Sequence, residues 1–175
     1  MKFLNLSESL KLIEVPDTIK VPNLESLDLE NCINLRRIHP SIGIHKKLTI
    51  LNLDWCKSLT SLPNKFEMEC LEELKLCGCS KITKIPEFGR NMKHVHYLNL
   101  SGTAITTLPT SIEHLTDLDW LDLRNCKNLV HLPDTIFNLK LLRRVYLWGC
   151  SKLDRLPENL ESGRASCRER VCMLV

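Results

Sequence analysis

Leucines recur along this chain in a short motif that returns every 23 or 24 residues. The motif reads L-x-x-L-x-L, and its second leucine position is taken in successive repeats by Leu4, Leu27, Leu51, Leu74, Leu98, Leu121 and Val145. Because apolar and other residues alternate over its last three positions, each motif predicts a short β-strand with one buried face. One such strand cannot bury its leucines alone, so it must stack on neighbouring repeats. The pattern therefore predicts a solenoid of about seven parallel strands.

A second apolar group follows each strand and closes the turn over the same core, as Leu59 and Leu62 do in the third repeat. Most of these turns end in a proline, at Pro16, Pro63, Pro86, Pro109, Pro133 and Pro157. Proline fixes φ and has no backbone N–H, which rules out a long helix that begins upstream of it. The segments opposite the strands are therefore predicted to be irregular or to form short α- or 3₁₀-turns.

The complete repeat reads L-x-x-L-x-L-x-x-C-x-x-L-x-x-L-P, as in LDWLDLRNCKNLVHLP at residues 118–133. This is the pattern of leucine-rich repeats. The predicted fold class is α/β, a leucine-rich-repeat horseshoe with a parallel β-sheet on its concave face and short helical or irregular segments on its convex face. We expect the repeats to fill residues 1–162 as one domain. Residues 163–175 break the pattern and resemble a translated sequencing adapter, so we expect a non-native or disordered tail there.

The composition narrows the possible partners. The chain has 175 residues, is 43% hydrophobic and carries a formal net charge of +3. Three arginines and one glutamate at residues 163–175 account for two of these charges, which leaves the first 162 residues at +1. A body so close to neutral lacks the basic clusters of nucleic-acid-binding surfaces, and no apolar run is long enough to span a membrane. We therefore expect neither a nucleic-acid partner nor a membrane partner.

Motifs for catalysis are missing from the sequence. The six glycines form neither a GxxxxGK[ST] nor a GxGxxG motif, so we predict no nucleotide cofactor. His94 and His96 could pair with Asp119 or Asp122 as acid–base groups, but no nucleophile motif accompanies them. The chain is therefore not expected to be an enzyme, and it is expected to need no cofactor.

Five cysteines share the position three residues after the last strand leucine. They are Cys32, Cys56, Cys79, Cys126 and Cys150. A small side chain with a weak donor fits at the inner end of a strand and can cap backbone carbonyls of the adjacent loop, so we predict a structural cysteine column. Metal binding is the rival interpretation, suggested by Cys77 and Cys79, but stacked repeats hold column members too far apart to share one zinc ion. Redox sensing by the outward-pointing Cys77 is a further alternative.

The strand register also defines which side chains face solvent. When the first leucine of the motif is counted as one, positions three, five, seven and eight are expected to lie on the concave face. All the tryptophans and tyrosines of the chain fall at these positions, namely Trp55, Tyr97, Trp120, Tyr146 and Trp148. Large aromatic side chains on an exposed face are typical of interface hot spots, so we predict a protein-binding surface. The alternative is that the rings only cover the strand backbone.

Charged residues are graded along the same face. Acidic residues lie toward the N-terminal end, at Glu8, Asp28, Glu30 and Asp54, while the basic Lys75, Arg124 and Arg144 lie toward the other end. Asp122 is expected on the same face. Complementary charge would affect partner choice and the association rate more than the affinity. We include these residues in the predicted binding surface, with a simple solvated face as the alternative.

Several stretches resemble the repeat region of plant intracellular immune receptors of the TIR-NB-LRR (toll-interleukin-receptor, nucleotide-binding, leucine-rich repeat) class. They are the C-x-x-L-x-x-L-P turn, IHPSIG at residues 38–43, LKLCGCSKITKIPE at 74–87 and LNLSGTAITTLPTSI at 98–112. The resemblance covers roughly residues 1–160. It implies the sensor region of a disease resistance protein, which binds pathogen effectors or guarded host proteins and restrains the receptor's own nucleotide-binding domain. It also implies a cytoplasmic or nuclear location, and nucleotide-binding and NAD-cleaving domains elsewhere in the receptor.

The ends of the chain favour a fragment of such a receptor. The first strand begins at once, without a polar capping unit, and no cap follows the last complete turn near Pro157. Two other interpretations remain open. One is a free-standing leucine-rich-repeat scaffold or adaptor unrelated to immunity, and the other is a set of repeats attached to an enzyme such as a kinase or a ubiquitin ligase. The domain encoded upstream would decide between them.

Overall fold

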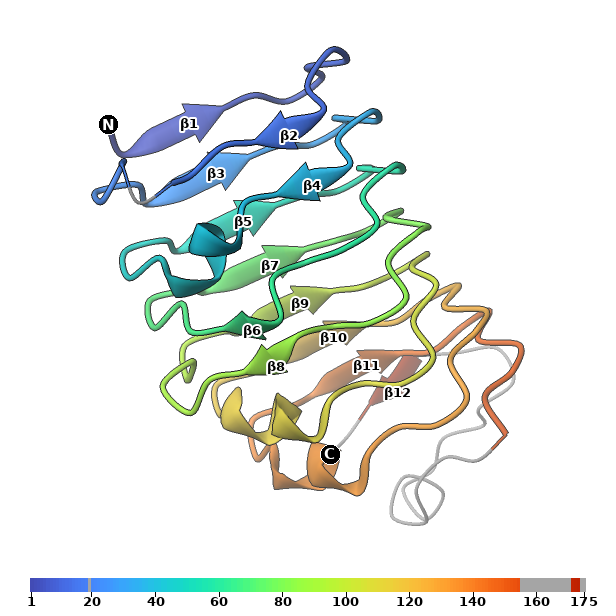
Figure 1. Ribbon diagram of the computed structural model, residues 1–175. Helices are drawn as coiled ribbons and strands as arrows, with labels where there is room; N and C mark the ends of the chain where they lie inside the picture. Colours follow the sequence, from blue (N-terminus) through green and yellow to red (C-terminus); the bar gives the residue numbers. More distant parts are fainter. Residues whose placement is uncertain (19, 155–170, 174–175) are drawn as a thin grey trace.

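The molecule is a stack of similar coils. The structure, a computed structural model, describes residues 1–18, 20–154 and 171–173. Each coil passes once through a long sheet and returns along the opposite side, as Figure 1 shows from the N-terminal coil in blue to the last coil in orange. The repeats of the sequence are therefore repeats of the structure.

Seven strands of three residues each pair in parallel, in the order of the repeats. They are β1 (Phe3–Asn5), β3 (Ser26–Asp28), β5 (Ile50–Asn52), β7 (Glu73–Lys75), β9 (Tyr97–Asn99), β10 (Trp120–Asp122) and β11 (Arg144–Tyr146). In every pair the anchor residues lie opposite each other, as Leu27 does with Leu51 and Leu121 with Val145. The register expected from the sequence and the leucine-rich-repeat fold class are both confirmed.

One continuous core runs through the stack. Each full repeat contributes the first, fourth and sixth positions of its motif, and in the third repeat Leu48, Leu51 and Leu53 have no exposed surface. Phe66 and Phe88 fill the core from the opposite side, with their ring centroids 6.4 Å apart. Burying one such side chain contributes roughly 1.5–3 kcal/mol. Rows of apolar side chains that pass from repeat to repeat therefore hold the stack together.

The convex side contains two kinds of short element. Three repeats have a 3₁₀-helix, which the structure places at η1 (Pro40–Ile44), η2 (Thr110–His114) and η3 (Asp134–Asn138). Two-residue strands also pair in parallel, β2 (Glu14–Val15) with β4 (Arg37–Ile38) and β6 (Lys65–Phe66) with β8 (Glu87–Phe88), and β4 directly precedes η1 in the same repeat. The expected helical turns are confirmed at three repeats, whereas the sequence did not predict the strand pairs. No helix in the described part of the chain is long and apolar enough to cross a membrane.

The turn after each strand has a left-handed residue at position eight. Its φ is positive in all seven repeats, at Glu8, Asn31, Trp55, Gly78, Gly102, Asn125 and Gly149. In six of these turns the N–H of this residue donates to the carbonyl at position seven of the next repeat, as Trp55 does to Cys77 at 2.6 Å and Asn31 to Asp54 at 2.8 Å. The left-handed turn thus extends the ladder of hydrogen bonds beyond the strands.

A further strand lies beside the last repeat. Strand β12 (Val171–Met173) pairs antiparallel with β11 and completes an eight-stranded sheet. These three residues belong to the stretch that we expected to be a non-native or disordered tail. The rest of that stretch, including residues 163–170, lies outside the described residues, and the prediction about the tail stays a prediction.

Candidate protein-binding face

The concave face consists of the outward-pointing side chains of the seven parallel strands and of the turns that follow them. The predicted aromatic residues differ in how far they protrude from it. Trp148 and Trp55 are 56% and 43% exposed, whereas Tyr97, Trp120 and Tyr146 are half-buried. The two exposed tryptophans are therefore the most accessible apolar groups of this predicted set.

Three of the rings form a row across strands β9, β10 and β11. The ring centroids of Tyr97 and Trp120 are 5.8 Å apart, and those of Trp120 and Tyr146 are 4.8 Å apart. The guanidinium of Arg144 lies over the Trp120 ring, 4.5 Å from its centroid, and that of Arg124 lies 5.4 Å from the centroid of Tyr146. Aromatic pairs and cation–π contacts of this geometry each contribute about 1 kcal/mol. The row is therefore a rigid platform.

Both arginines of the platform are also paired with aspartates of the same sheet. Arg144 lies 2.8 Å from the Asp119 carboxylate, and Arg124 donates to both carboxylate oxygens of Asp122. Asp122 is only 1% exposed. The expectation that Asp122 faces solvent is therefore wrong, because its carboxylate lies beneath Arg124 and also accepts the Arg124 backbone N–H. The positive charges of Arg124 and Arg144 are therefore largely neutralised by aspartates of the same sheet.

In most repeats the side chain at position five of the motif forms a hydrogen bond to the turn that follows the strand. Its side-chain oxygen accepts the backbone N–H of position seven in five of them, from Asn5 to Ser7, Asp28 to Glu30, Asn52 to Asp54, Asn99 to Ser101 and Asp122 to Arg124. An Asn or Asp side chain that bonds two residues ahead forms a local turn. Asp28 and Asp122 thus have a structural role in addition to any role in binding.

The acidic end of the face is crowded. The side-chain amide of Asn52 donates to Asp28 at 3.1 Å and to Glu30 at 3.2 Å, which brings the two carboxylates close together. Asp54 lies next to them, and burial together with the nearby charges of Glu30 and Asp28 raises its pKa to about 6. Desolvation and like charges both disfavour an ionised carboxylate. This end of the face therefore carries negative charge that the chain does not compensate fully.

Lys75 and Trp55 lie where the two ends meet. Lys75 pairs with Glu73 at 2.7 Å and lies 5.8 Å from the ring centroid of Tyr97. The Trp55 ring covers Gly78 of the next repeat, so closely that a Cβ on that glycine would be 2.4 Å from the ring. Trp55 has a φ of 62°, which is rare for a bulky residue. The sequence signal for this turn, which the predictions missed, is the recurrence of Gly and Asn at position eight.

The cysteine column forms one line of hydrogen bonds along the core. Each thiol lies within hydrogen-bond distance of the carbonyl at position six of the preceding repeat, from Cys32 to Leu6, Cys56 to Leu29, Cys79 to Leu53, Cys126 to Leu100 and Cys150 to Leu123, at 3.0–3.2 Å. Thr103, in the same column, donates instead to Leu100 of its own repeat. Each of these carbonyls also accepts the backbone N–H of position nine in its own repeat, so the thiol of the next coil supplies a second donor to the same oxygen.

Burial also makes the column thiols unreactive. It raises the pKa of Cys56 and Cys126 to about 12 and that of Cys150 to about 11, and it raises the pKa of Cys32 and Cys79 as well. The thiolate is both the nucleophile and the metal ligand, so such groups resist both reactions at neutral pH. Among the described residues, no three His, Cys, Asp or Glu side chains are grouped as a metal site would require.

The possible acid–base groups are not brought together. His94 lies 3.3 Å from Asp117, and no contact joins it or His96 to the side chain of Asp119 or Asp122 within the described residues. The carboxylate of Asp119 is paired with Arg144 and that of Asp122 with Arg124. Asp119 and Asp122 therefore belong to ion pairs of the solenoid, and the four groups do not make a joint site.

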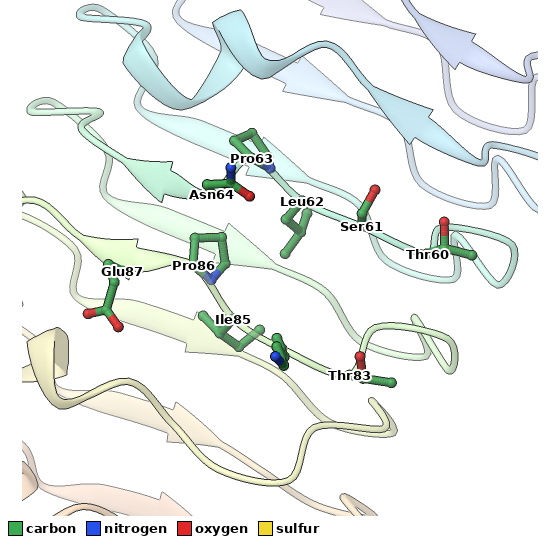
Figure 2. Close-up of a pocket in the computed structure, with 10 residues that line it drawn as sticks. Thr60, Ser61, Leu62, Pro63, Asn64, Thr83, Ile85, Pro86 and Glu87 are labelled. Atoms are coloured by element: carbon green, nitrogen blue, oxygen red, sulfur yellow. The ribbon is translucent and has the colours of Figure 1, made fainter.

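A groove also opens on the return side of the coils, between residues 60–64 and 83–87 (Figure 2). Its volume is about 330 Å³, and Leu62, Ile85 and two prolines line it beside exposed hydroxyl groups. In other coils a backbone hydrogen bond joins the return segments of two successive repeats, such as the bond from the Ala104 N–H to the Ile82 carbonyl at 2.9 Å. Within the described chain, no such backbone hydrogen bond joins residues 60–63 to residues 83–86. The groove lies where these two segments are not hydrogen-bonded to each other.

Comparisons with known proteins agree with this architecture. The family model described as "Disease resistance protein RPS4B-like, leucine-rich repeats" matches residues 66–166. The chain is 40% identical to the TMV resistance protein N of Nicotiana glutinosa over 91% of its own length and 14% of that protein. It is 46% identical to the disease resistance protein RPP5 of Arabidopsis thaliana, over 90% of the chain and 11% of that protein. The chain thus spans less than one sixth of these curated relatives.

A solved structure shares the fold. The leucine-rich-repeat protein LIC12759 of Leptospira interrogans is 25% identical and aligns with a TM-score of 0.57, over 91% of this chain and 45% of that one.

The stacked motif, the parallel sheet and the 3₁₀-turns define a leucine-rich-repeat solenoid, which is a protein-interaction domain. The chain belongs to the leucine-rich-repeat region of plant TIR-NB-LRR disease resistance proteins, in the RPS4B-like family. The resemblance seen in its motifs is confirmed.

Proposed function

We propose that this chain is the sensor region of an intracellular plant immune receptor and binds a pathogen effector or a guarded host protein through its concave face. The observation that carries the proposal is the row of Tyr97, Trp120 and Tyr146, with exposed Trp148 on the same face. A rigid aromatic cluster on an otherwise polar surface is the usual centre of a binding interface. The receptor would act in the cytoplasm or the nucleus.

The same region would restrain the receptor before activation. Its relatives are far longer than this chain, so other domains of the receptor would be covalently tethered to it. Tethering raises the effective concentration of such a domain to the millimolar range, so even a weak contact would be populated. The contact that we propose is with the receptor's own nucleotide-binding domain.

A test uses the full-length receptor gene that contains this region, expressed in leaves with and without its matching effector. Trp148→Ala removes an exposed ring, whereas Trp120→Ala would also remove the ring between two tyrosines and weaken the fold. Val130→Ala is the matched control, because Val130 is 41% exposed and lies outside the concave face.

We expect Trp148→Ala to reduce effector-dependent cell death and effector binding several-fold at equal protein level, and Val130→Ala to leave both unchanged. Cell death without effector would show that the substitution releases the restraint. Unchanged binding and unchanged signalling in Trp148→Ala would reject the concave face as the recognition surface.

A further inference from the structure

The concave face has two chemically different halves. On the first three repeats Glu8, Asp28, Glu30 and Asp54 all point outward, and within the described chain none has a lysine, arginine or histidine at ion-pair distance. Of the cations near this half, Lys2 is already paired with Glu25 at 2.8 Å, and Lys57 lies over the Trp55 ring, 5.7 Å from its centroid. The N-terminal half therefore presents carboxylates that its own side chains leave unpaired.

The carboxylates of the acidic half are held where they are. Asn52 donates to both Asp28 and Glu30, and the backbone N–H of Cys77 holds Asp54 at 2.7 Å. Fixed carboxylates cannot turn away from one another, and the raised pKa of Asp54 reflects its burial first and the nearby charges of Glu30 and Asp28 second. A cation supplied from outside would relieve the repulsion without any rearrangement of the face.

The C-terminal half is apolar and close to neutral. Tyr97, Trp120 and Tyr146 form its centre, and Arg124 and Arg144 are each tied to an aspartate of the sheet. The charge of an arginine that is already paired with an aspartate attracts an acidic partner only weakly. The arginines thus act as flat covers over the rings. The half therefore attracts aromatic and aliphatic groups and does not act as a basic patch.

From these two halves, and as a refinement that rests on the proposed function, we infer that the concave face binds an extended segment of a partner protein with lysine or arginine at one end and apolar residues at the other. The basic end lies over strands β3 and β5, and the apolar end lies over β9 to β11. Charge complementarity selects this occupant over an acidic segment, since the acidic half would repel the latter.

The spacing of the strands fixes the length between the two ends of the segment. Neighbouring strands lie about 4.8 Å apart, so β5 to β9 spans roughly 10 Å and β3 to β11 roughly 24 Å. An extended chain covers about 3.4 Å per residue. About three to seven residues should therefore separate the basic group from the apolar group.

The test measures binding of synthetic peptides to the complete 175-residue chain by isothermal titration and by tryptophan fluorescence at low and moderate salt. The first probe has three lysines, a five-residue Gly/Ser spacer and a Leu-Phe-Leu end. The second replaces the lysines by glutamates, and the third lacks the spacer. No probe contains tryptophan, so all fluorescence changes come from the protein.

The matched variants change the same net charge in two places. Glu30→Gln with Asp54→Asn neutralises the acidic half. Glu14→Gln with Glu69→Gln neutralises two carboxylates outside the concave face, where Glu14 pairs with Arg37 and Glu69 with Lys46.

We expect the spaced basic probe to bind at least five-fold more tightly than either other probe, with an affinity that falls as salt rises. Glu30→Gln with Asp54→Asn should lower this affinity about five-fold, and the control pair should not change it. Equal or tighter binding of the acidic probe, the same affinity in the first variant pair, or no binding of any probe up to about 1 mM would each overturn the inference. If Trp148→Ala still weakens effector recognition in the receptor, the proposed function stands and only the partner chemistry is wrong.

Discussion

The Asp54 carboxylate accepts a hydrogen bond from the backbone N–H of Cys77 in the next repeat, with 2.7 Å between Oδ1 and the nitrogen. In other repeats the side-chain oxygen of an Asn or Asp at position five accepts the backbone N–H of position seven in the same turn. The fourth repeat has Lys75 at position five, which has no acceptor. Asp54 therefore replaces the missing side chain from one coil away.

The burial of Asp54 predicts an unusual pH dependence of stability. Because the pKa of Asp54 in the folded chain is about 6, above its ordinary value of 3.8, the folded state binds a proton that the unfolded state has released between these pH values. The contribution of Asp54 to stability is thus fully present below about pH 4 and is lost as the pH rises through 6. Burial is the main cause of the raised pKa of Asp54, and the charges of Glu30 and Asp28 add to it, whereas the Cys77 N–H and the charge of Lys75 act to lower that pKa.

Asp54→Asn should remove that loss while it keeps an oxygen for the Cys77 N–H. We expect the variant to be more stable than the parent chain by about 1 kcal/mol at pH 7.5 and closer to it at pH 4.5, as measured by urea unfolding. Asp54→Ala should be less stable than Asp54→Asn at both pH values, because it leaves the Cys77 N–H without that partner. A parent chain and an Asp54→Asn variant with the same stability at both pH values would contradict this account.

Gly78 and Gly102 offer a matched pair for the strain at position eight. Both have a left-handed φ, of 71° and 69°, but a Cβ on Gly78 would strike the Trp55 ring, whereas a Cβ on Gly102 would be 3.5 Å from the nearest atoms. We expect Gly102→Ala to cost about 1 kcal/mol from backbone strain alone, and Gly78→Ala to cost about 2 kcal/mol or more. In a Trp55→Asn background the two costs should become similar. An equal cost for the two glycines in the parent chain would refute the contact.

The strands, their register and the leucine core could be predicted from the sequence, because a period-two motif repeated seven times leaves one way to bury all the leucines. The cysteine position at the inner end of each strand followed from the same register. The convex elements could not be predicted. Whether a segment such as PNKFEM at residues 63–68 becomes a strand pair or a 3₁₀-turn depends on the coil next to it, as with Phe66 against Phe88.

The candidate face was predicted as a set of positions and not as a set of contacts. Register placed Trp120, Tyr146 and Arg144 on one surface, but it could not show that Arg144 lies over the Trp120 ring. It also placed Asp122 among exposed residues, because position five does point outward. The Arg124 side chain then folds back and covers it, which depends on rotamers that a repeat motif does not specify.

The rate at which each cysteine is alkylated should show how deeply the cysteine column is buried. Cys70 is exposed, while Cys56, Cys79 and Cys126 are fully buried with pKa values raised by that burial. A pKa of about 12 leaves roughly a thousand-fold less thiolate at neutral pH than the ordinary value of 9.0, and burial also blocks access. We expect iodoacetamide to label Cys70 first and the three column cysteines only after unfolding in urea, as read by peptide mass spectrometry. Labelling of Cys126 at the rate of Cys70 in the native chain would rule out the buried column.

The pair of Asp122 and Arg124 allows the last prediction. The Asp122 carboxylate is buried while the Arg124 side chain is 48% exposed, so the two partners do not contribute equally. Removing the cation strands a buried charge, whereas neutralising the carboxylate does not. We expect Arg124→Ala to lower the free energy of unfolding by about 2 kcal/mol and Asp122→Asn by about 1 kcal/mol or less. The double variant Asp122→Asn with Arg124→Ala should then be more stable than Arg124→Ala alone, because no unpaired charge remains. Urea unfolding of the four chains gives the coupling, and a double variant that is less stable than Arg124→Ala would show that the loss comes from the arginine's packing over Tyr146 and not from the stranded carboxylate.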